Sequence, residues 1–331
     1  MQSEFLDLGF DKFIYAKDRL SLADCFTKNS RCGIYILHFQ NGEYYVGLAI
    51  DVVNRHAQHR LNHLDIEYIS FKEVNKEKLA TVEKQAVYAL ENLKKSLRNI
   101  NLVSIVTGDT DLDLIVSSEV QQQWSNYELD FESIETNRFD YPDLRRKYST
   151  KFAKLKSSKY FDQICEILQA YVLNAIPLPY KTEYSFWCCS CLPAGRNKVF
   201  SRVNIFWQEV FTLYEDEFMM LNDKKVFKDL AVSIHLCKSK LFEHYSEQEL
   251  KAKYISLELT DHFYEPGGQD QQNIIIGAVD FLNLLDDTPI LDAIKEFNLR
   301  LMRKGGCIFN RYHCFDLADE ALRIDNLEFD K

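Results

Sequence analysis

The sequence lacks the features that mark several specialised classes of protein. No run of apolar residues approaches the roughly 18 that a membrane-spanning helix needs. Residues 1–20 mix acidic and basic side chains without the apolar stretch of a secretory signal, and no internal repeat or low-complexity tract follows. Hydrophobic residues make up 46% and charged residues 27% of the chain, which is typical of a globular protein with a full core. We therefore expect a cytoplasmic protein without a membrane partner, and 331 residues favour two domains.

A disulfide framework is also missing. The nine cysteines are odd in number and irregularly spaced, which indicates reduced thiols. Two groups could suggest zinc: Cys188, Cys191, His235 and Cys237 in one, and Cys307, His313 and Cys314 in the other. Because a strand-like run sends neighbouring side chains to opposite faces, we expect buried free thiols instead. The polar residues of the glycine-containing loop at 261–270 could suggest a second metal site, but solvated loop polarity is the simpler interpretation.

An excess of positive charge is missing as well, since the net charge is -10. Residues 31–108 hold ten Lys and Arg against eight Asp and Glu, a balance of +2, and residues 1–30 sum to -1. Residues 109–331 must therefore carry -11, because -1 + 2 - 11 = -10. The segment 31–108 is compatible with contact to phosphates, whereas the rest of the chain as a whole is not.

The pattern of residues 31–108 predicts a hairpin, a helix, a strand and a second helix. Extended runs at 32–39 and 43–48 flank Asn41-Gly42, a dipeptide that favours a two-residue hairpin turn with positive φ at both positions. Asp51 predicts the cap of a helix that runs to about residue 64. Alternation over 66–74 predicts a third strand, and the amphipathic stretch 76–97 predicts a long helix. Residues 1–30, with apolar side chains near period 3.6, predict a helical extension.

Residues 109–331 predict a larger, mixed α/β accessory domain of no recognised family. Helices are expected at 160–174 and 290–302, strands at 187–192, 203–214, 230–236, 254–259 and 273–282, and a frayed tail at 325–331. A basic loop at 193–198 beside aromatic residues suggests either contact with nucleic acid or a simple connection.

Chemistry-bearing side chains are concentrated in the first of these domains. Gly33-Ile34-Tyr35 lies in the first strand and Tyr45-Val46-Gly47 in the second, so the hairpin brings the two tripeptides side by side. Arg55 and His59 are four residues apart and share one face of the predicted helix. Glu83 lies on the apolar face of the long helix, where a carboxylate is costly unless a cation is near. Each residue alone fits strand packing or a solvated helix face, but their joint spacing favours a functional site.

This order of elements resembles the GIY-YIG nuclease superfamily: Gly-Ile-Tyr, Tyr-Val-Gly, an arginine with a histidine four residues later, a glutamate on a helix, and an asparagine near the end. The resemblance covers residues 31–105, about a quarter of the chain. The valine of Tyr-Val-Gly departs from the pattern at an apolar position, and the last asparagine fits Asn99 better than Asn101. The resemblance implies an α+β fold in which a three-stranded antiparallel sheet is flanked by helices, with 31–108 as the nuclease domain.

The resemblance also implies a metal-dependent endonuclease that leaves 5′-phosphate and 3′-hydroxyl ends. One divalent ion, Mg²⁺ or alternatively Mn²⁺, would be held by Glu83 and would polarise the scissile phosphate. Tyr35 would take or relay a proton from the attacking water, and Arg55 would clamp the phosphate. Tyr45 and His59 would position water or phosphate. Asn99 would bind the substrate or hold the site together.

The expected partner is nucleic acid, with DNA favoured over RNA by the resemblance. A restriction or host-defence role is expected by analogy with catalytic domains that are fused to accessory domains. Residues 109–331 would dock a protein partner or mediate self-association. The alternative is a catalytically silent nucleic-acid-binding or assembly protein whose acidic C-terminal domain docks that partner.

Overall fold

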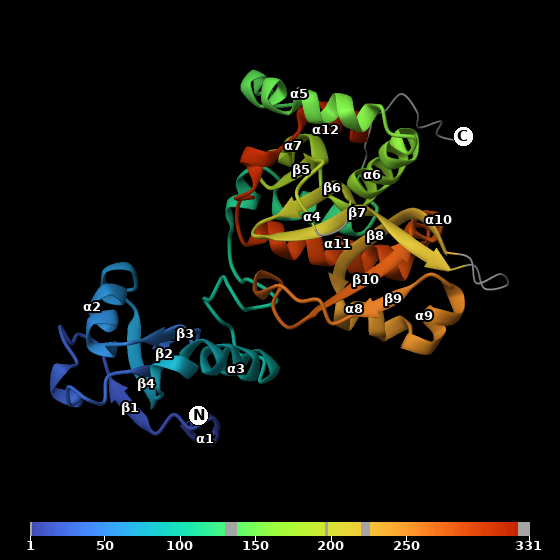
Figure 1. The fold of residues 1–331 in the computed structure, drawn as a ribbon. Helices are drawn as coiled ribbons and strands as arrows, with labels where there is room; N and C mark the ends of the chain where they lie inside the picture. Colours follow the sequence, from blue (N-terminus) through green and yellow to red (C-terminus); the bar gives the residue numbers. More distant parts are fainter. Residues whose placement is uncertain (1, 130–137, 196–197, 220–225, 324–331) are drawn as a thin grey trace. The chain divides into compact units, whose positions relative to one another are not determined.

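The computed structural model describes residues 2–129, 138–195, 198–219 and 226–323 (Figure 1). The chain forms two compact units, Met1–Gly108 and Asp109–Lys331. The hydrophobic core clusters each lie wholly within one unit, so each unit has a core of its own. The tail expected at 325–331 and residues 196–197 of the basic loop lie outside the described residues.

The first unit is built on a four-stranded antiparallel sheet. Its strands are β1 (Lys12–Tyr15), β2 (Gly33–Phe39), β3 (Tyr44–Ala49) and β4 (Ile66–Glu73), in the order β1-β4-β2-β3. All seven residues of β2 are buried, so its side chains alternate between two apolar layers. Ile34 and Ile36 pack in the layer that contains α3 (Leu79–Asn92), whereas Tyr35 packs in the layer that contains the start of α2 (Val52–Asn62).

The helices of the first unit follow from clear start and stop signals. Asp51 caps α2 as predicted, since its Oδ1 accepts hydrogen bonds from Val53 N at 2.9 Å and Asn54 N at 3.1 Å. The long helix is shorter than predicted: η2 (Lys76–Lys78) precedes α3, and Lys94 adopts a left-handed φ of 57° two residues beyond its end. A short 3-10 helix, η1 (Ala23–Cys25), lies between β1 and β2.

The prediction of a three-stranded sheet preceded by a helical extension is wrong. Within the described part of residues 1–30, only α1 (Gln2–Asp7) is α-helical. Gly9, two residues beyond the end of this helix, has a φ of 82°, a left-handed conformation that favours glycine. The next segment pairs as β1 with β4, with Phe13 opposite Ser70. The helical spacing of the phenylalanines was misleading because pairing with a distant strand outweighs local preference.

The hairpin turn also differs from the prediction. Of Asn41 and Gly42 only the glycine has positive φ, at 84°. Phe39 O accepts from Gly42 N at 3.0 Å, and Phe39 N donates to Glu43 O at 3.0 Å. The loop therefore has three residues and ends in a glycine bulge, the second common solution for a hairpin.

The second unit is built on a six-stranded antiparallel sheet. Its strands, in the order β5-β6-β7-β8-β10-β9, are β5 (Trp187–Cys191), β6 (Lys198–Ile205), β7 (Gln208–Met219), β8 (Val226–Cys237), β9 (Glu258–Thr260) and β10 (Gln271–Gly277). Along β8, Val232 and Ile234 join the main core, whereas Ala231 joins a small cluster on the other face. One face of the sheet thus carries the main core.

Helices surround this sheet and supply the rest of its core (Figure 1). α11 packs against β8 and α6, and α12 packs against α5, α6 and β5. The elements are η3 (Asp111–Leu114), α4 (Ser118–Ser125), α5 (Pro142–Lys156), α6 (Phe161–Ala175), α7 (Pro179–Thr182), α8 (Lys238–His244), α9 (Glu247–Lys253), η5 (Glu265–Gly267), α10 (Ala278–Leu285), α11 (Thr288–Arg303), η6 (Asn310–Tyr312) and α12 (Phe315–Ala321).

Three of the predicted strands of this unit are wrong in extent. Of the run 254–259, only Glu258 and Leu259 belong to a strand, β9. The run 203–214 contains the turn at Phe206 and Trp207, because apolar residues continue through the turn. The run 273–282 changes from β10 to α10 at Ala278. At the coarser level the prediction is confirmed, since the chain is a mixed α+β protein. Within the described residues, no helix has the length and apolarity needed to cross a membrane.

Candidate active site

Four elements of the first unit bring five of the six predicted site residues together. Tyr35 comes from the central strand β2 and Tyr45 from its neighbour β3. Arg55 and His59 come from α2, whose N-terminus is fixed by the Asp51 cap. Glu83 comes from α3 and lines the same hollow as Tyr45 and Arg55. Five of the six predicted residues are thus neighbours.

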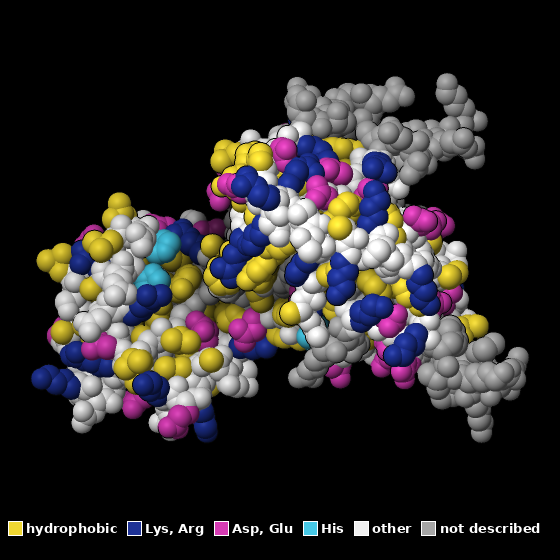
Figure 2. Space-filling view, turned by 45° about the horizontal axis from the view of Figure 1, so that its top comes forward, with side chains coloured by type: hydrophobic (Ala, Val, Ile, Leu, Met, Phe, Trp, Pro, Cys, Tyr) yellow, Lys and Arg dark blue, Asp and Glu magenta, His cyan; other side chains and the backbone are white. Residues whose placement is uncertain are grey.

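The hollow, which we call the first hollow, has a volume of about 470 Å³ and opens beside β3 and the start of α2. Its lining also includes Asn54 and Gln58, which the sequence pattern did not single out. Gln58 Oε1 accepts from Arg55 Nη1 at 3.0 Å and so orients the guanidinium. Its position three residues after Arg55 on a helix was the available signal. Figure 2 shows histidine beside basic side chains on the surface of this unit.

The buried centre of the site is a hydrogen-bonded chain through the Tyr35 hydroxyl. Tyr35 Oη lies 2.7 Å from His59 Nε2 and 3.3 Å from Arg55 Nε. Because a guanidinium can only donate, the phenol oxygen accepts from Arg55. The phenol proton is therefore free to point at His59, whose Nε2 then acts as the acceptor.

The protonation states agree with this direction of donation. Burial, followed by the charge of Arg55, lowers the pKa of His59 to about 4, so the imidazole is neutral at pH 7. Burial also raises the pKa of Tyr35 above its usual range, with Tyr45 and Glu83 adding to the rise and Arg55 opposing it. The hydrogen bond to Tyr35 is the main reason that the pKa of Arg55 is raised. In the protein without bound ions, Tyr35 is therefore a neutral donor at pH 7.

The aromatic rings around this chain are packed in contact. The ring centroid of Tyr45 lies 4.9 Å from that of His59 and 6.3 Å from that of Tyr35. His63, one turn further along α2, stacks on His59 at 5.8 Å. The imidazole of His59 is therefore held by side chains on both strands and on its own helix.

The absence of a side chain at Gly47 leaves room for the ring of Tyr35 on the neighbouring strand. A Cβ atom at Gly47 would lie 2.3 Å from Tyr35 Oη and 2.5 Å from Tyr35 Cζ. Those distances are far inside van der Waals contact, so the tyrosine ring occupies the space that any other side chain would need. The glycine of the second tripeptide thus admits the hydroxyl of the first.

Asn99 is the predicted residue that does not join the group. Its side chain is buried, accepts from Val46 N at 2.9 Å and donates to Val46 O at 2.8 Å. The amide therefore completes the free edge of β3 as another strand would. Of its two expected roles, this geometry supports holding the site together.

The donors of the first hollow fit one hard divalent ion. Magnesium commonly binds one or two protein carboxylates and completes its octahedral shell with water and substrate phosphate oxygens. Glu83 supplies such a carboxylate in an open hollow. Among the residues that the structure describes, no three His, Cys, Asp or Glu side chains are grouped to hold a metal ion. A metal here would therefore depend on water and substrate for most of its ligands.

All seven cysteines of the second unit are free thiols, and all except the partly buried Cys165 lie in its interior. Cys189 and Cys191 belong to the main core, whereas Cys188 lies 3.5 Å from Cys307, sulfur to sulfur. His313 Nδ1 accepts from the backbone N of Cys189, so this histidine is engaged by the strand itself.

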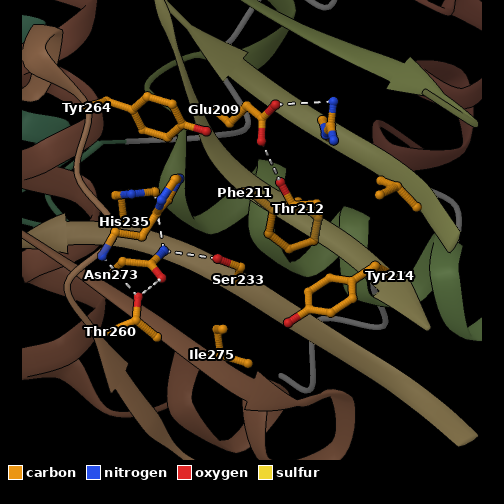
Figure 3. A pocket seen from close by; sticks show the side chains of 13 residues that line it. Glu209, Phe211, Thr212, Tyr214, Ser233, His235, Thr260, Tyr264, Asn273 and Ile275 are labelled. Carbon is orange, nitrogen blue, oxygen red and sulfur yellow. Dashed lines mark hydrogen bonds and ion pairs between the residues drawn. The ribbon is translucent and has the colours of Figure 1, made fainter. Parts of the chain in front are cut away.

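A second hollow, of about 450 Å³, lies on the sheet of the second unit (Figure 3). It contains His262 of the 261–270 loop and the deeply buried His235, whose pKa burial lowers to about 3. Its cation, Arg202, lies 3.2 Å from Glu209. Because this pair neutralises itself, the first hollow is the better candidate for a phosphodiester.

Comparison of the chain with protein-family models, curated proteins and solved structures gives no match.

Proposed function

We propose that the first unit is the catalytic domain of a metal-dependent endonuclease that hydrolyses phosphodiester bonds. The observation that carries the proposal is the meeting of Tyr45, Arg55 and Glu83 at one open hollow, with Tyr35 and His59 hydrogen-bonded beside it. A cation, a carboxylate and a proton-transfer chain at one place are what in-line displacement at phosphorus requires.

Glu83 would hold one Mg²⁺ or Mn²⁺, which when bound polarises the phosphate and offsets the charge on the leaving oxygen. Arg55 would bind a non-bridging phosphate oxygen through guanidinium N–H groups other than the two that Tyr35 and Gln58 engage. Tyr45 lines the hollow and would orient the water or the phosphate.

The proton path that fits this geometry is a relay. Tyr35 would accept a proton from the attacking water while its own proton passes to Nε2 of neutral His59, 2.7 Å away. This path avoids a free phenolate, which burial disfavours. His59 would thus be the final acceptor and Tyr35 the group that touches the water.

The substrate favoured by the resemblance is DNA, with 5′-phosphate and 3′-hydroxyl products, and a restriction or host-defence role is a proposal by analogy. The test is cleavage of supercoiled plasmid and of single-stranded oligonucleotides by the full chain with Mg²⁺, Mn²⁺ or EDTA. We expect cutting with either metal and none with EDTA.

The variants Glu83→Gln and Tyr35→Phe should each reduce the cutting rate by about 100-fold or more, since each removes a polar group that is needed in the transition state. Matched controls in the same unit are Glu77→Gln and Tyr15→Phe, which alter exposed side chains outside the hollow and should cut normally. Cutting that survives Glu83→Gln would refute the metal assignment. An inactive but folded wild-type protein would favour the alternative of a silent nucleic-acid-binding or assembly protein.

A further inference from the structure

The second unit contains a basic helix that its overall charge conceals. Residues 141–160 hold seven Lys and Arg against one Asp, a balance of +6 within a segment that sums to -11. Most of these residues lie on α5 (Figure 1). Leu144, Tyr148 and Leu155 turn inward and fix α5 to the core. Lys147, Lys151 and Lys154 run along one edge of this inward stripe, since Lys151 lies three residues after Tyr148 and four before Leu155.

Three lysines along this edge of α5 are exposed, and Lys147 Nζ and Lys151 Nζ each use one donor on a backbone carbonyl, Arg311 O at 3.4 Å and Leu192 O at 3.0 Å, which leaves further donors for an anion. Lys147, Lys151 and Lys154 are exposed and follow one another at helical spacings of four and three, so they share a face. Among the described residues, the ion pairs of α5 with carboxylates involve Arg145 and Arg146, not these three lysines. These pairs join the two arginines to four carboxylates, Asp140, Asp143, Asp316 and Asp319, and none of them involves the three lysines.

Exposed aromatic rings lie at the start of the same helix. Phe139 and Tyr141 are 53% and 42% exposed, which is unusual for large rings and marks a surface that a partner can cover. Their centroids lie 5.4 Å and 6.3 Å from that of Tyr184, and the three ring planes are within 27° of parallel. Figure 2 shows hydrophobic and basic side chains side by side on the second unit.

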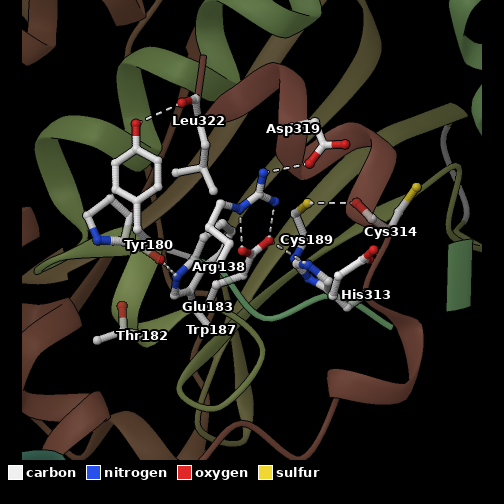
Figure 4. Close-up of polar contacts among 12 residues, drawn as sticks. Arg138, Tyr180, Thr182, Glu183, Trp187, Cys189, His313, Cys314, Asp319 and Leu322 are labelled. Carbon is white, nitrogen blue, oxygen red and sulfur yellow. Dashed lines mark hydrogen bonds and ion pairs between the residues drawn. The ribbon is translucent and has the colours of Figure 1, made fainter. Parts of the chain in front are cut away.

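This aromatic patch is held by a buried polar network (Figure 4). Arg138, next to Phe139, donates two hydrogen bonds of 2.7 Å to the carboxylate of Glu183, next to Tyr184. His313 lies 3.0 Å from the same carboxylate, which is fully buried. These contacts fix the backbone that carries the rings, so a ligand that stacks on the rings would lose little of their conformational entropy.

We propose that Lys147, Lys151 and Lys154, with Phe139 and Tyr141, form a binding surface for single-stranded nucleic acid, here called the α5 surface. Lysines that follow a line contact successive phosphates, and exposed rings stack on unpaired bases. A duplex hides its bases, so the rings favour a single strand. The inference deepens the proposed nuclease function, because it gives the second unit the task of holding substrate.

The test is binding of a fluorescein-labelled oligothymidylate of about 20 nucleotides to the full chain in EDTA, followed by fluorescence anisotropy at several salt concentrations. Because EDTA prevents cutting, a failure of the nuclease proposal leaves this measurement intact, and the reverse also holds. We expect Lys151→Gln with Lys154→Gln to weaken binding by about tenfold and to reduce the salt slope by about 1.4, since each phosphate contact contributes about 0.7. Phe139→Ala should weaken binding about fivefold or more with an unchanged salt slope, because stacking releases no counterions.

The matched control is Lys238→Gln with Lys251→Gln, which removes the same charge from exposed positions of the same unit away from α5. This control should bind as the wild type does. Equal losses in both lysine pairs would show that charge alone, not the α5 surface, attracts the strand. Binding of a duplex as tight as that of the single strand, with no loss in Phe139→Ala, would overturn the role of the rings.

Discussion

At the scale of single residues, the space that the Tyr35 ring occupies requires glycine at position 47. Gly47→Ala would place a methyl group 2.3 Å from Tyr35 Oη, so the ring must move and its bond to His59 must break. We expect a loss of about 1–3 kcal/mol of stability, as for other overpacked sites. Cleavage at a temperature where the variant is folded should fall by about tenfold or more.

A glycine on the same hairpin supplies the comparison. Gly42→Ala meets no atom within 4 Å, but its φ of 84° strains any other residue, at a cost of about 1 kcal/mol. Both variants should therefore melt at lower temperature, and Gly47→Ala alone should lose activity. Equal activity in the two folded variants would contradict the idea that Tyr35 must keep its position.

The buried His59 predicts an unusual pH dependence of cleavage. The proposed relay needs neutral His59, and its pKa of about 4 keeps it neutral well below pH 7. The rate should therefore show no inflection near pH 6.5, where an ordinary histidine titrates, and should fall as the pH approaches 4. The measurement is the single-turnover rate from about pH 4 to pH 8, with circular dichroism at each pH to verify folding. A clear inflection near 6.5 that disappears in His59→Gln would contradict a buried, neutral acceptor.

The resemblance predicts which five side chains meet, whereas strand alternation and the helical repeat predict only the face of its own element on which each side chain lies. Asn99 could not be resolved in this way. Its role depends on which backbone group its amide reaches across 53 residues of chain, and sequence spacing does not encode that.

At the scale of elements, the edge of β3 depends on a segment that has no regular secondary structure. Tyr44 N donates to Ser96 O, Arg98 N donates to Tyr44 O, and the Asn99 amide completes the row at Val46. Asn99→Ala would leave Val46 N and O without these partners, and we expect a loss of about 2 kcal/mol of stability. Cleavage by the folded variant should remain within a few-fold of wild type.

The neighbouring Asn101, which is exposed, gives a matched variant, since Asn101→Ala should change neither stability nor cleavage. Thermal denaturation and cleavage of both variants separate the two roles expected for Asn99. Lost cleavage at an unchanged melting temperature would mean that its amide acts on the substrate.

Elements also show where sequence patterns fail. β1 was missed because its partner β4 lies more than 50 residues away, and such pairing leaves no local period. The basic character of α5 was missed for another reason. Summing charge over residues 109–331 hides the +6 of residues 141–160 in a total of -11, so a running sum over one helix length was the signal needed.

At the scale of the whole molecule, the two units differ in how many of their histidines have a pKa that burial lowers. His38, His56 and His59 of the first unit have pKa values lowered to about 4, and burial is the first cause for each. The second unit contains His235, with a pKa lowered to about 3. Because these histidines are held neutral in the folded protein, acid lowers the free energy of unfolding.

The sign of the effect follows from proton binding. Below about pH 6.5 the unfolded chain binds protons at these histidines while the folded chain does not, so the free energy of unfolding falls from pH 6.5 to about pH 4. At pH 5 each buried histidine should cost about 1–2 kcal/mol. With three such groups against one, the first unit should be the more acid-sensitive of the two.

Calorimetry of the full chain at pH 7 and pH 5 measures this difference, because separate cores allow separate unfolding transitions. The transition of the first unit, identified by its shift in Gly42→Ala, should move down further than the other. His56→Gln tests the cause: neither ring nitrogen of His56 has a hydrogen-bond partner within the described structure, so the imidazole is held neutral by burial and by nearby cations. That variant should reduce the difference between the melting temperatures of the first unit at pH 7 and pH 5. An unchanged difference would mean that the acid sensitivity arises from other groups.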